Sequence, residues 1–157
     1  MTKADLQSIL DDKTKPVGSL GRLEKLAVQA ASVLGHEQTE EAAATLTIFA
    51  GDHGIAANGV SAFPQEVTGQ MVANFLAGGA AANAIANTLG IPVTVVDCGI
   101  ATPPSGRSAL VNMRLGEGTA DSAKGPAMTS DCARRAVDQG RRYGVDLAGK
   151  IACFGEM

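Results

Sequence analysis

The sequence predicts an α/β fold, a parallel Rossmann-like sheet with flanking helices, preceded by N-terminal helices that belong to a smaller helical subdomain. Three short, apolar, β-prone runs alternate with segments of helical periodicity, as expected when right-handed crossovers join parallel strands. The 157 residues are 45% hydrophobic but only 3% aromatic, which predicts an aliphatic core. We place the helical segment at 1–41 and the α/β domain at 42–157.

Two helices are expected before the first strand. Leu6, Ile9 and Leu10 give the first helix one apolar face, and it ends before Pro16. For the second helix, Ser19 is the expected N-cap and Gly35 the expected stop. The apolar positions of this second helix recur every three or four residues: Leu23, Leu26, Ala27, Ala30 and Leu34.

Buried strands are predicted at 45–50, 92–97 and 150–154. In open parallel sheets, ligands bind beyond the carboxyl ends of the strands. Each predicted strand delivers a carboxylate to that edge, and these are Asp52, Asp97 and Glu156. The sequence therefore directs attention to the carboxyl edge of the sheet.

Helices fill the intervals between these strands. Pro64 fits the first position of a helix that Gly78-Gly79 ends, and a further helix is expected at 80–89. We interpret the stretch from Ala101 to Pro126, rich in Gly, Pro and Ser, as an excursion over the surface with a weak β-like run at 110–115. Thr129 or Ser130 is predicted to cap the last helix. The expected apolar side of that helix comprises Ala133, Ala136, Val137, Tyr143 and Leu147.

Composition excludes several classes of function. A formal charge of −3 argues against nucleic-acid partners, which favour concentrated Lys and Arg. No run of about eighteen apolar residues is present to span a membrane. The three cysteines lack CxxC spacing, so neither a disulfide framework nor a zinc site is expected, and a reducing cytoplasmic location is inferred.

Asp52 and His53 directly follow a strand, as catalytic pairs often do, and His53 could serve as a general base or ligand. The alternative is that Asp52 caps a turn and His53 bonds locally, and spacing alone favours this alternative. His36 has no partnered ligand pattern, so no metal site is predicted.

Asp97 could contact a ribose hydroxyl, although a carboxylate after a strand more often satisfies loop amides. Cys98 has no neighbouring histidine to activate it, which disfavours a cysteine nucleophile. Phe63 and Pro64, together with Met71 on the following helix, could line an apolar slot for a flat ring, or they could belong to the core.

Seven segments carry a more specific signal, and they keep their order along the chain: Lys15–Glu24, Phe49–Ile55, Gly59–Thr68, Gln70–Phe75, Val96–Ile100, Val111–Arg114 and Gly125–Met128. Together they resemble the nicotinate-nucleotide–dimethylbenzimidazole phosphoribosyltransferases. The resemblance implies transfer of phosphoribose from nicotinate mononucleotide to 5,6-dimethylbenzimidazole, giving α-ribazole 5'-phosphate for the lower ligand of cobalamin, and nicotinate. It also implies a homodimer and no cofactor.

The resemblance assigns roles to particular residues. Phe63, Pro64 and Met71 would border the benzimidazole slot with Gln70 beside them, and Glu156 would lie at the phosphoribosyl site. The general base of the family is a glutamate from the later part of the chain, so no catalytic residue is assigned within residues 1–157. A glycine-rich phosphate loop would follow Glu156.

Two departures from the family pattern stand out. Asp121 occupies a position where the family commonly has Asn, which is expected to add an unneeded negative charge. The segments also represent about half of a family member, so we expect an artificial or truncated end at Met157, an exposed apolar sheet edge and a chain that is inactive alone. The alternatives are a non-catalytic ligand-binding or interaction module, or one half of a split enzyme.

Overall fold

A computed structural model describes residues 1–35, 43–105, 107–148 and 150–157. The chain divides into two compact units, Met1–Ala43 and Ala44–Met157. The predicted domain boundary at 41/42 and the second histidine, His36, lie outside the described residues. Within the described part of the chain, no helix has the length and apolar character needed to cross a membrane.

The first unit contains the two expected helices, α1 (Lys3–Asp11) and α2 (Arg22–Leu34). Thr2 caps α1, since its Oγ1 accepts a hydrogen bond from the Asp5 amide at 3.2 Å while the Asp5 carboxylate accepts from the Thr2 amide at 2.7 Å. Hydrogen bonding to the Asp5 carboxylate, first from the Thr2 backbone amide and then from the Thr2 side chain, lowers the pKa of Asp5. Gly35 follows α2 as its C-cap, as predicted.

Ser19 was the wrong residue to expect at the start of α2, where Gly21 is the N-cap. The chain reaches the helix through successive turns in which Gly18 and Gly21 adopt positive φ, and the Ser19 amide bonds to the Pro16 carbonyl at 3.1 Å. Glu24 in the first turn of α2 binds the preceding turn, because its Oε1 accepts from the Leu20 amide at 3.2 Å. The turns ahead of the helix, rather than a hydroxyl cap, therefore decide where it begins.

The expected apolar face of α2 is not its buried face. Leu23 and Leu26 are 63% and 56% exposed, and Glu24 is the buried residue of the helix at 5%. Lys15 Nζ lies 2.8 Å from Glu24 Oε1, which compensates the charge. This bond to Lys15 is the main cause that lowers the pKa of Glu24, followed by the bond from the Leu20 amide.

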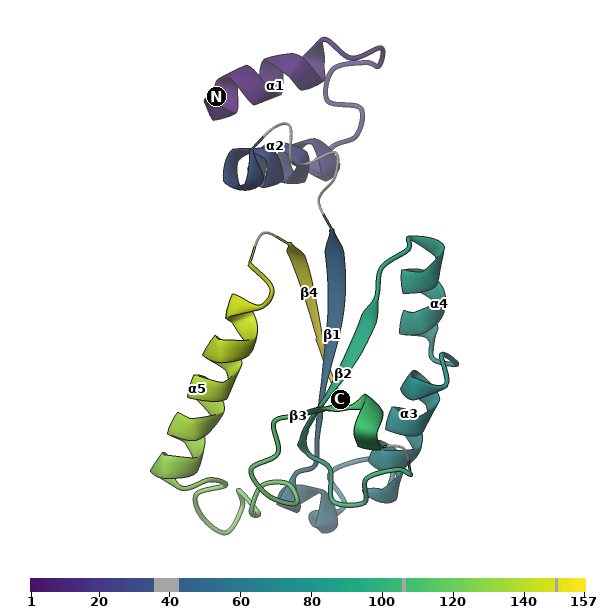
Figure 1. Cartoon of the computed structure of the whole chain (residues 1–157), viewed down its shortest axis with the longest axis vertical. Coiled ribbons are helices and arrows are strands. Elements are labelled where there is room, and N and C mark those ends of the chain that lie inside the picture. The colour runs from purple at the N-terminus through teal and green to yellow at the C-terminus, as the bar shows by residue number, and fades with distance from the viewer. Residues whose placement is uncertain (36–42, 106, 149) are drawn as a thin grey trace. The chain divides into compact units, whose positions relative to one another are not determined.

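The second unit is built on a parallel sheet of four strands in the order β3-β2-β1-β4 (Figure 1). The three expected strands are confirmed, and a fourth is added from the predicted surface excursion. Their bounds are β1 Ala44–Gly51, β2 Val93–Gly99, β3 Val111–Asn112 and β4 Ile151–Glu156. β3 lies within the weak β-like run predicted at 110–115 and pairs with β2 through Val96 and Val111, so this part of the predicted excursion belongs to the sheet.

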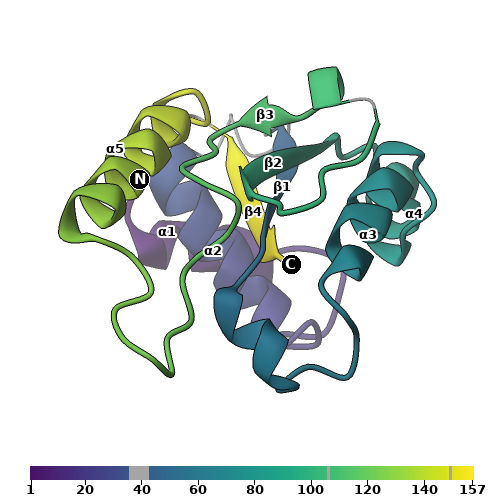
Figure 2. The same ribbon diagram turned by 90° about the horizontal axis from the view of Figure 1, so that it is seen from below.

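Helices lie on both faces of this sheet. The helices α3 (Glu66–Leu76) and α4 (Ala81–Thr88) cover one face, and α5 (Ser130–Val145) covers the other (Figure 2). Short 3-10 helices occur at Gly54–Asn58 and Arg107–Ala109. The chain runs from β1 outward to β3 and then returns to place β4 on the opposite side of β1. The strand order therefore reverses between β1 and β4, the position where open sheets bind ligands.

Pro64 does not occupy the first position of α3, as the sequence suggested, because the helix begins at Glu66 with Gln65 as its N-cap. The Pro64 carbonyl instead accepts from the Val67 amide at 3.1 Å, which makes a turn ahead of the helix. Thr129 rather than Ser130 caps α5, and its Oγ1 accepts from the Cys132 amide at 3.1 Å.

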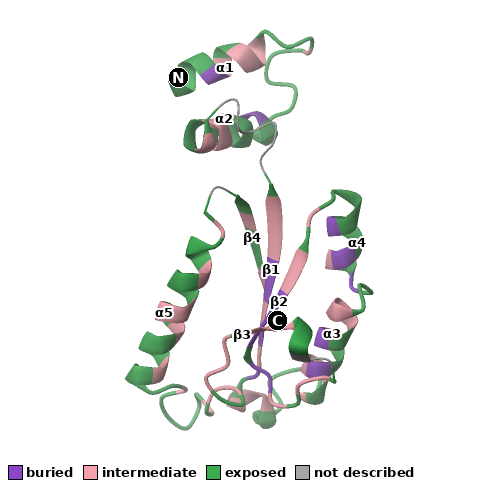
Figure 3. Cartoon of the chain, in the orientation of Figure 1, coloured by how far each residue is buried: buried purple, intermediate pink, exposed green. Residues whose placement is uncertain are grey.

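The core of the second unit lies between the sheet and α3, and its buried cluster consists of Ala50, Val72, Val95 and Ile100. Figure 3 shows buried residues on β1, β2, α3 and α4, whereas α5 and β4 carry none among their described residues. The alternate residues of β1 face α5, where the Phe49 and Tyr143 rings meet edge to face at 6.1 Å. β4 is an edge strand, and its Phe154 is 61% exposed.

Candidate functional site

Two cavities open on either side of the carboxyl end of β1 and share the wall Gly51-Asp52-His53. The first, which we call the α3 cavity, has a volume of approximately 360 Å³ and is bordered by the loop after β1 and by α3. The second, which we call the α5 cavity, has a volume of approximately 430 Å³ and lies between the sheet, the 113–119 loop and α5. Both volumes are in the usual range for small-molecule sites.

The α3 cavity brings together three of the residues that the sequence suggested, Phe63, Pro64 and Met71. Met157, which follows β4, contributes to the same lining. Gln70 is exposed on α3 and is not among the described lining residues. The difference follows from helical geometry, because Val67 and Met71 lie one turn apart on the same face and Gln70 points in a different direction.

Asp52 is only 4% exposed and its carboxylate is fully engaged. Oδ1 accepts from Thr68 Oγ1 at 2.7 Å, and Oδ2 accepts from the Ala101 amide at 2.7 Å. The Asp52 carbonyl also accepts from the Thr119 amide at 3.0 Å. Asp52 thus joins α3, the segment after β2 and the 116–119 loop to the end of β1, which is a positioning role.

His53 is exposed and lines both cavities. Its backbone is fixed, since its carbonyl accepts from the Ala56 amide at 3.0 Å and the residue forms a bridge with Thr119. The imidazole therefore stands on a fixed backbone at the rim that the two cavities share. The His53 imidazole can donate a hydrogen bond to a ligand in either cavity or accept one from it.

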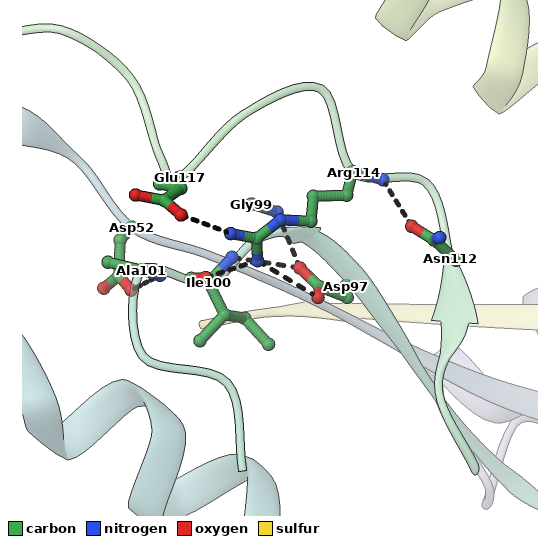
Figure 4. Close-up of polar contacts among 8 residues, drawn as sticks. All are labelled: Asp52, Asp97, Gly99, Ile100, Ala101, Asn112, Arg114 and Glu117. Carbon is green, nitrogen blue, oxygen red and sulfur yellow. Dashed lines mark hydrogen bonds and ion pairs between the residues drawn. The ribbon is translucent and has the colours of Figure 1, made fainter. Parts of the chain in front are cut away.

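Asp97 is 2% exposed and bonds to the loop that follows its own strand. Its Oδ1 accepts from the Gly99 and Ile100 amides, both at 2.9 Å, and Arg114 Nη1 lies 3.4 Å from Oδ2 (Figure 4). Arg114 also donates to the Ile100 carbonyl and pairs with Glu117 at 3.6 Å. These contacts match the loop-amide interpretation of Asp97 and fix the 113–117 segment to β2.

Cys98 lies on the wall of the α5 cavity, beside Asp97. Desolvation by the surrounding protein raises the pKa of the Cys98 thiol, and the negative charge of Asp97 raises it further. The thiolate is therefore scarcer at neutral pH than in an ordinary cysteine, which agrees with the expectation that Cys98 is not an activated nucleophile.

Asp121 was expected to add an unneeded negative charge, but the structure gives its carboxylate three partners. It accepts from Asn58 Nδ2 at 2.9 Å and from the Ala123 amide at 3.0 Å, and it pairs with Lys124 Nζ at 3.1 Å. The bond from Asn58 is the largest of the contributions that lower the pKa of Asp121. Asp121 therefore links the 3-10 helix after β1 to the loop before α5.

Glu156 is the last residue of β4 and pairs with Phe49 across the ladder. Its side chain is exposed and is not among the described lining residues of the α3 cavity. Phe154, two residues earlier, contacts Phe49 on the α5 face of the sheet, so strand alternation puts Glu156 on that face and Met157 on the α3 face. The structure thus does not bring Glu156 together with Phe63 and Met71 in one cavity.

Sequence reasoning missed the α5 cavity and the contributions of Thr68 and Met157. The signal for the α5 cavity was present in the small residues Cys132, Ala136 and Gly140, which recur at four-residue steps of α5. No local pattern marks Met157, since its place depends on β4 pairing with β1. In the described ranges, no group of three or more His, Cys, Asp or Glu side chains is arranged to hold a metal ion.

Comparison with known proteins adds a second line of information. A family model described as phosphoribosyltransferase matches residues 1–157. Nicotinate-nucleotide–dimethylbenzimidazole phosphoribosyltransferase of Variovorax paradoxus (strain S110) is 50% identical over 154 residues, which are 98% of this chain and 44% of that protein. The protein of the same name from Shewanella oneidensis is 45% identical over 159 residues, 97% of this chain and 44% of the relative.

Solved structures agree with these relatives. The crystal structure of CobT from Thermus thermophilus matches with a TM-score of 0.83 and 37% identity, over 99% of this chain and 47% of that chain. A second structure from the same organism, of a nicotinate-nucleotide–dimethylbenzimidazole phosphoribosyltransferase, gives a TM-score of 0.78 and 36% identity, over 99% of this chain and 48% of that chain. The chain spans slightly less than half the length of the relatives it matches.

Proposed function

The chain belongs to the nicotinate-nucleotide–dimethylbenzimidazole phosphoribosyltransferase family, and from this premise we propose that it serves the transfer of phosphoribose from nicotinate mononucleotide to 5,6-dimethylbenzimidazole. The products are α-ribazole 5'-phosphate, used in the lower ligand of cobalamin, and nicotinate. We assign two roles to residues 42–157. They bind the acceptor ring and they align the phosphoribosyl donor.

One observation carries this proposal, namely the α3 cavity at the point where the strand order reverses. Its lining combines an aromatic ring at Phe63, a rigid edge at Pro64 and a polarizable thioether at Met71. These groups suit a flat, apolar, bicyclic ring, because aromatic and sulfur contacts favour the faces and edges of such a ring. Gln70 is assigned a place at the outer edge of this site.

The chemistry needs little from the protein beyond placement and proton removal. The pyridinium leaving group departs as a neutral base, the ribose carbon gains oxocarbenium character, and the attacking benzimidazole nitrogen must lose its proton. We assign Glu156 to the phosphoribosyl group, since it ends the strand next to β1, and we keep His53 and Asp97 as residues at the edge of the site. Proton removal is assigned to a glutamate that does not belong to residues 1–157.

The test combines binding and turnover with the 157-residue chain. Calorimetry with 5,6-dimethylbenzimidazole is expected to show binding that Met71→Ala in the α3 cavity weakens. Incubation with both substrates is expected to give no α-ribazole phosphate, and turnover would show that residues 1–157 contain the base. A non-catalytic module would also show binding without turnover. A second experiment therefore adds the C-terminal half of a relative, and formation of α-ribazole phosphate would show that the chain is part of an enzyme.

We further propose a cytoplasmic homodimer. Support comes from apolar side chains that the first unit leaves exposed on α2, with Leu23, Leu26 and Val33 at 63%, 56% and 77%. Exposed apolar residues on one helix are typical of an association surface. Light scattering on the purified chain checks the oligomeric state, and a monomer at high concentration would exclude this part of the proposal.

A further inference from the structure

The α5 cavity exists because the residues of α5 that face it are small. Cys132, Ala136 and Gly140 lie at four-residue steps along the helix and all border the cavity, with Phe49 of β1 opposite. Of the predicted apolar side of α5, Ala136 and Tyr143 face the sheet, whereas Val137 is 55% exposed and does not fill this space. The small side chains leave a space of approximately 430 Å³ between α5 and the sheet.

Beyond Gly140, an aromatic pair holds α5 to the sheet. Tyr143 follows Gly140 by three residues, and its ring meets Phe49 edge to face at 6.1 Å. The Tyr143 hydroxyl and Thr47 Oγ1 are 3.0 Å apart, and Thr47 is only 1% exposed. Because both the ring and the hydroxyl of Tyr143 are held, α5 keeps its distance from the sheet at this end.

The opposite wall, formed by the 113–119 loop, is fixed to the strand ends. Met113 donates its amide to the Asp97 carbonyl at 2.9 Å, and Thr119 donates its amide to the Asp52 carbonyl at 3.0 Å. Gly118 has φ +99°, and a Cβ there would come within 2.6 Å of the Asp52 carbonyl oxygen. The loop therefore lies directly against β1, and the cavity is walled on this side by backbone that has little freedom to move.

The lining defines which ligands the cavity can accept. Met113, Leu115 and Met128 give it an apolar surface, and no Lys or Arg is among the described lining residues. The Asp52 carboxylate is engaged by the Thr68 hydroxyl and the Ala101 amide, outside the lining. A phosphate or carboxylate would meet no Lys or Arg here, and burial of an unpaired charge is costly. The lining also includes Gln139 and His53, which bring an amide and an imidazole to a ligand.

We propose that the α5 cavity is a second binding site of this chain, for an uncharged planar compound of one or two fused rings. The ring lies over Phe49 between Met113 and Met128, and a single polar group of the ligand reaches Gln139 or His53. Methionine side chains adapt to ring edges and faces, which suits such a ligand. This site is separate from the α3 cavity and does not depend on the transfer reaction proposed above.

The methionines provide a site-resolved test. The chain has five, of which Met113 and Met128 border the α5 cavity, Met71 and Met157 border the α3 cavity, and Met1 borders neither. With the methyl groups labelled with carbon-13, titration with indole is expected to shift the Met113 and Met128 signals saturably, with Met1 unchanged. Saturable shifts confined to Met71 and Met157, or no saturable shift, would overturn the proposal.

Variants of α5 separate the two cavities. Ala136→Leu is expected to fill the space and to weaken indole binding at the Met113 and Met128 signals at least tenfold, leaving Met71 and Met157 responsive. Ala133→Leu is the matched control, because Ala133 lies on the same helix but is exposed. If Ala136→Leu does not fold, Gly140→Leu takes its place, since a Cβ at Gly140 meets nothing within 4 Å. Wild-type binding by a folded filling variant contradicts the assignment.

Discussion

Thr68 Oγ1 donates a 2.7 Å hydrogen bond to Oδ1 of Asp52, and this contact joins the helix that borders the α3 cavity to the strand end that borders both cavities. Asp52 is 4% exposed, so this bond forms with little competition from water. This hydrogen bond therefore adds to the packing of Val72 against Ala50 and Val95 in holding α3 to β1.

Replacing Thr68 by Val keeps the side-chain shape and removes the hydroxyl. The change is expected to lower the free energy of unfolding by about 1–3 kcal/mol, the usual cost of a buried group left without its partner. Urea unfolding measures it. Thr88→Val is the matched control, because the Thr88 hydroxyl donates to the Ala84 carbonyl on the exposed side of α4, and its loss should cost less than about 0.5 kcal/mol. Equal effects of the two changes would contradict the role of the Asp52 contact.

Gly118 and Gly125 lie in the same loop region but should respond differently to Ala. At Gly118 the positive φ and the contact with the Asp52 carbonyl both oppose a Cβ, so Gly118→Ala is expected to destabilise the fold by about 2–4 kcal/mol. At Gly125 a Cβ meets nothing within 4 Å, so Gly125→Ala should be neutral or slightly stabilising. Thermal unfolding of both variants checks the contrast, and a tolerated Gly118→Ala would disprove the tight packing of this loop.

Phe63→Ala should weaken 5,6-dimethylbenzimidazole binding about tenfold, because roughly 1.4 kcal/mol of aromatic contact is lost. Titration calorimetry gives the dissociation constant. Phe154→Ala is the control, since Phe154 is similarly exposed, at 61% against 69% for Phe63, but does not border the α3 cavity. A larger loss at Phe154 than at Phe63 would place the ring elsewhere.

The Lys15–Glu24 pair makes the stability of the chain dependent on acid pH. The bond to Lys15 lowers the pKa of Glu24 below its ordinary value of 4.5, so the folded state binds this proton less readily than the unfolded state. The stabilisation is complete well above pH 4.5 and is lost as the pH falls through that value towards the folded pKa. Unfolding midpoints from about pH 7 to about pH 3 should fall more steeply for the wild type than for Glu24→Gln, and parallel curves would contradict the linkage.

Local signals were enough to predict β1, β2, β4 and the helices. The strands are continuous apolar runs, and Gly35 and Thr129 are recognisable caps at helix ends. β3 lies within the weak β-like run predicted at 110–115, but its bounds could not be derived from the sequence, because a strand of two residues is defined by its pairing with β2. Ser19 and Pro64 were misplaced for the same reason, since turns formed with neighbouring segments decide where α2 and α3 begin.

The candidate site was predictable where its residues are close in sequence. Phe63, Pro64 and Met71 fall within one turn and one helix, so their association follows from local geometry. Met157 joins them only because β4 lies beside β1, a pairing between segments far apart in the chain. The α5 cavity also required tertiary information, because a row of small residues indicates space only when the facing sheet is known.

The shared wall Gly51-Asp52-His53 constrains how this protein can diversify. A substitution there alters both cavities at once, so selection for a new ligand on one side carries a side effect on the other. Substitutions on α3 or α5 each alter a single cavity. Relatives that differ in ligand preference should therefore differ mainly on α3 and α5. Substitutions at Gly51, Asp52 and His53 should be rare among them, because each would change both cavities.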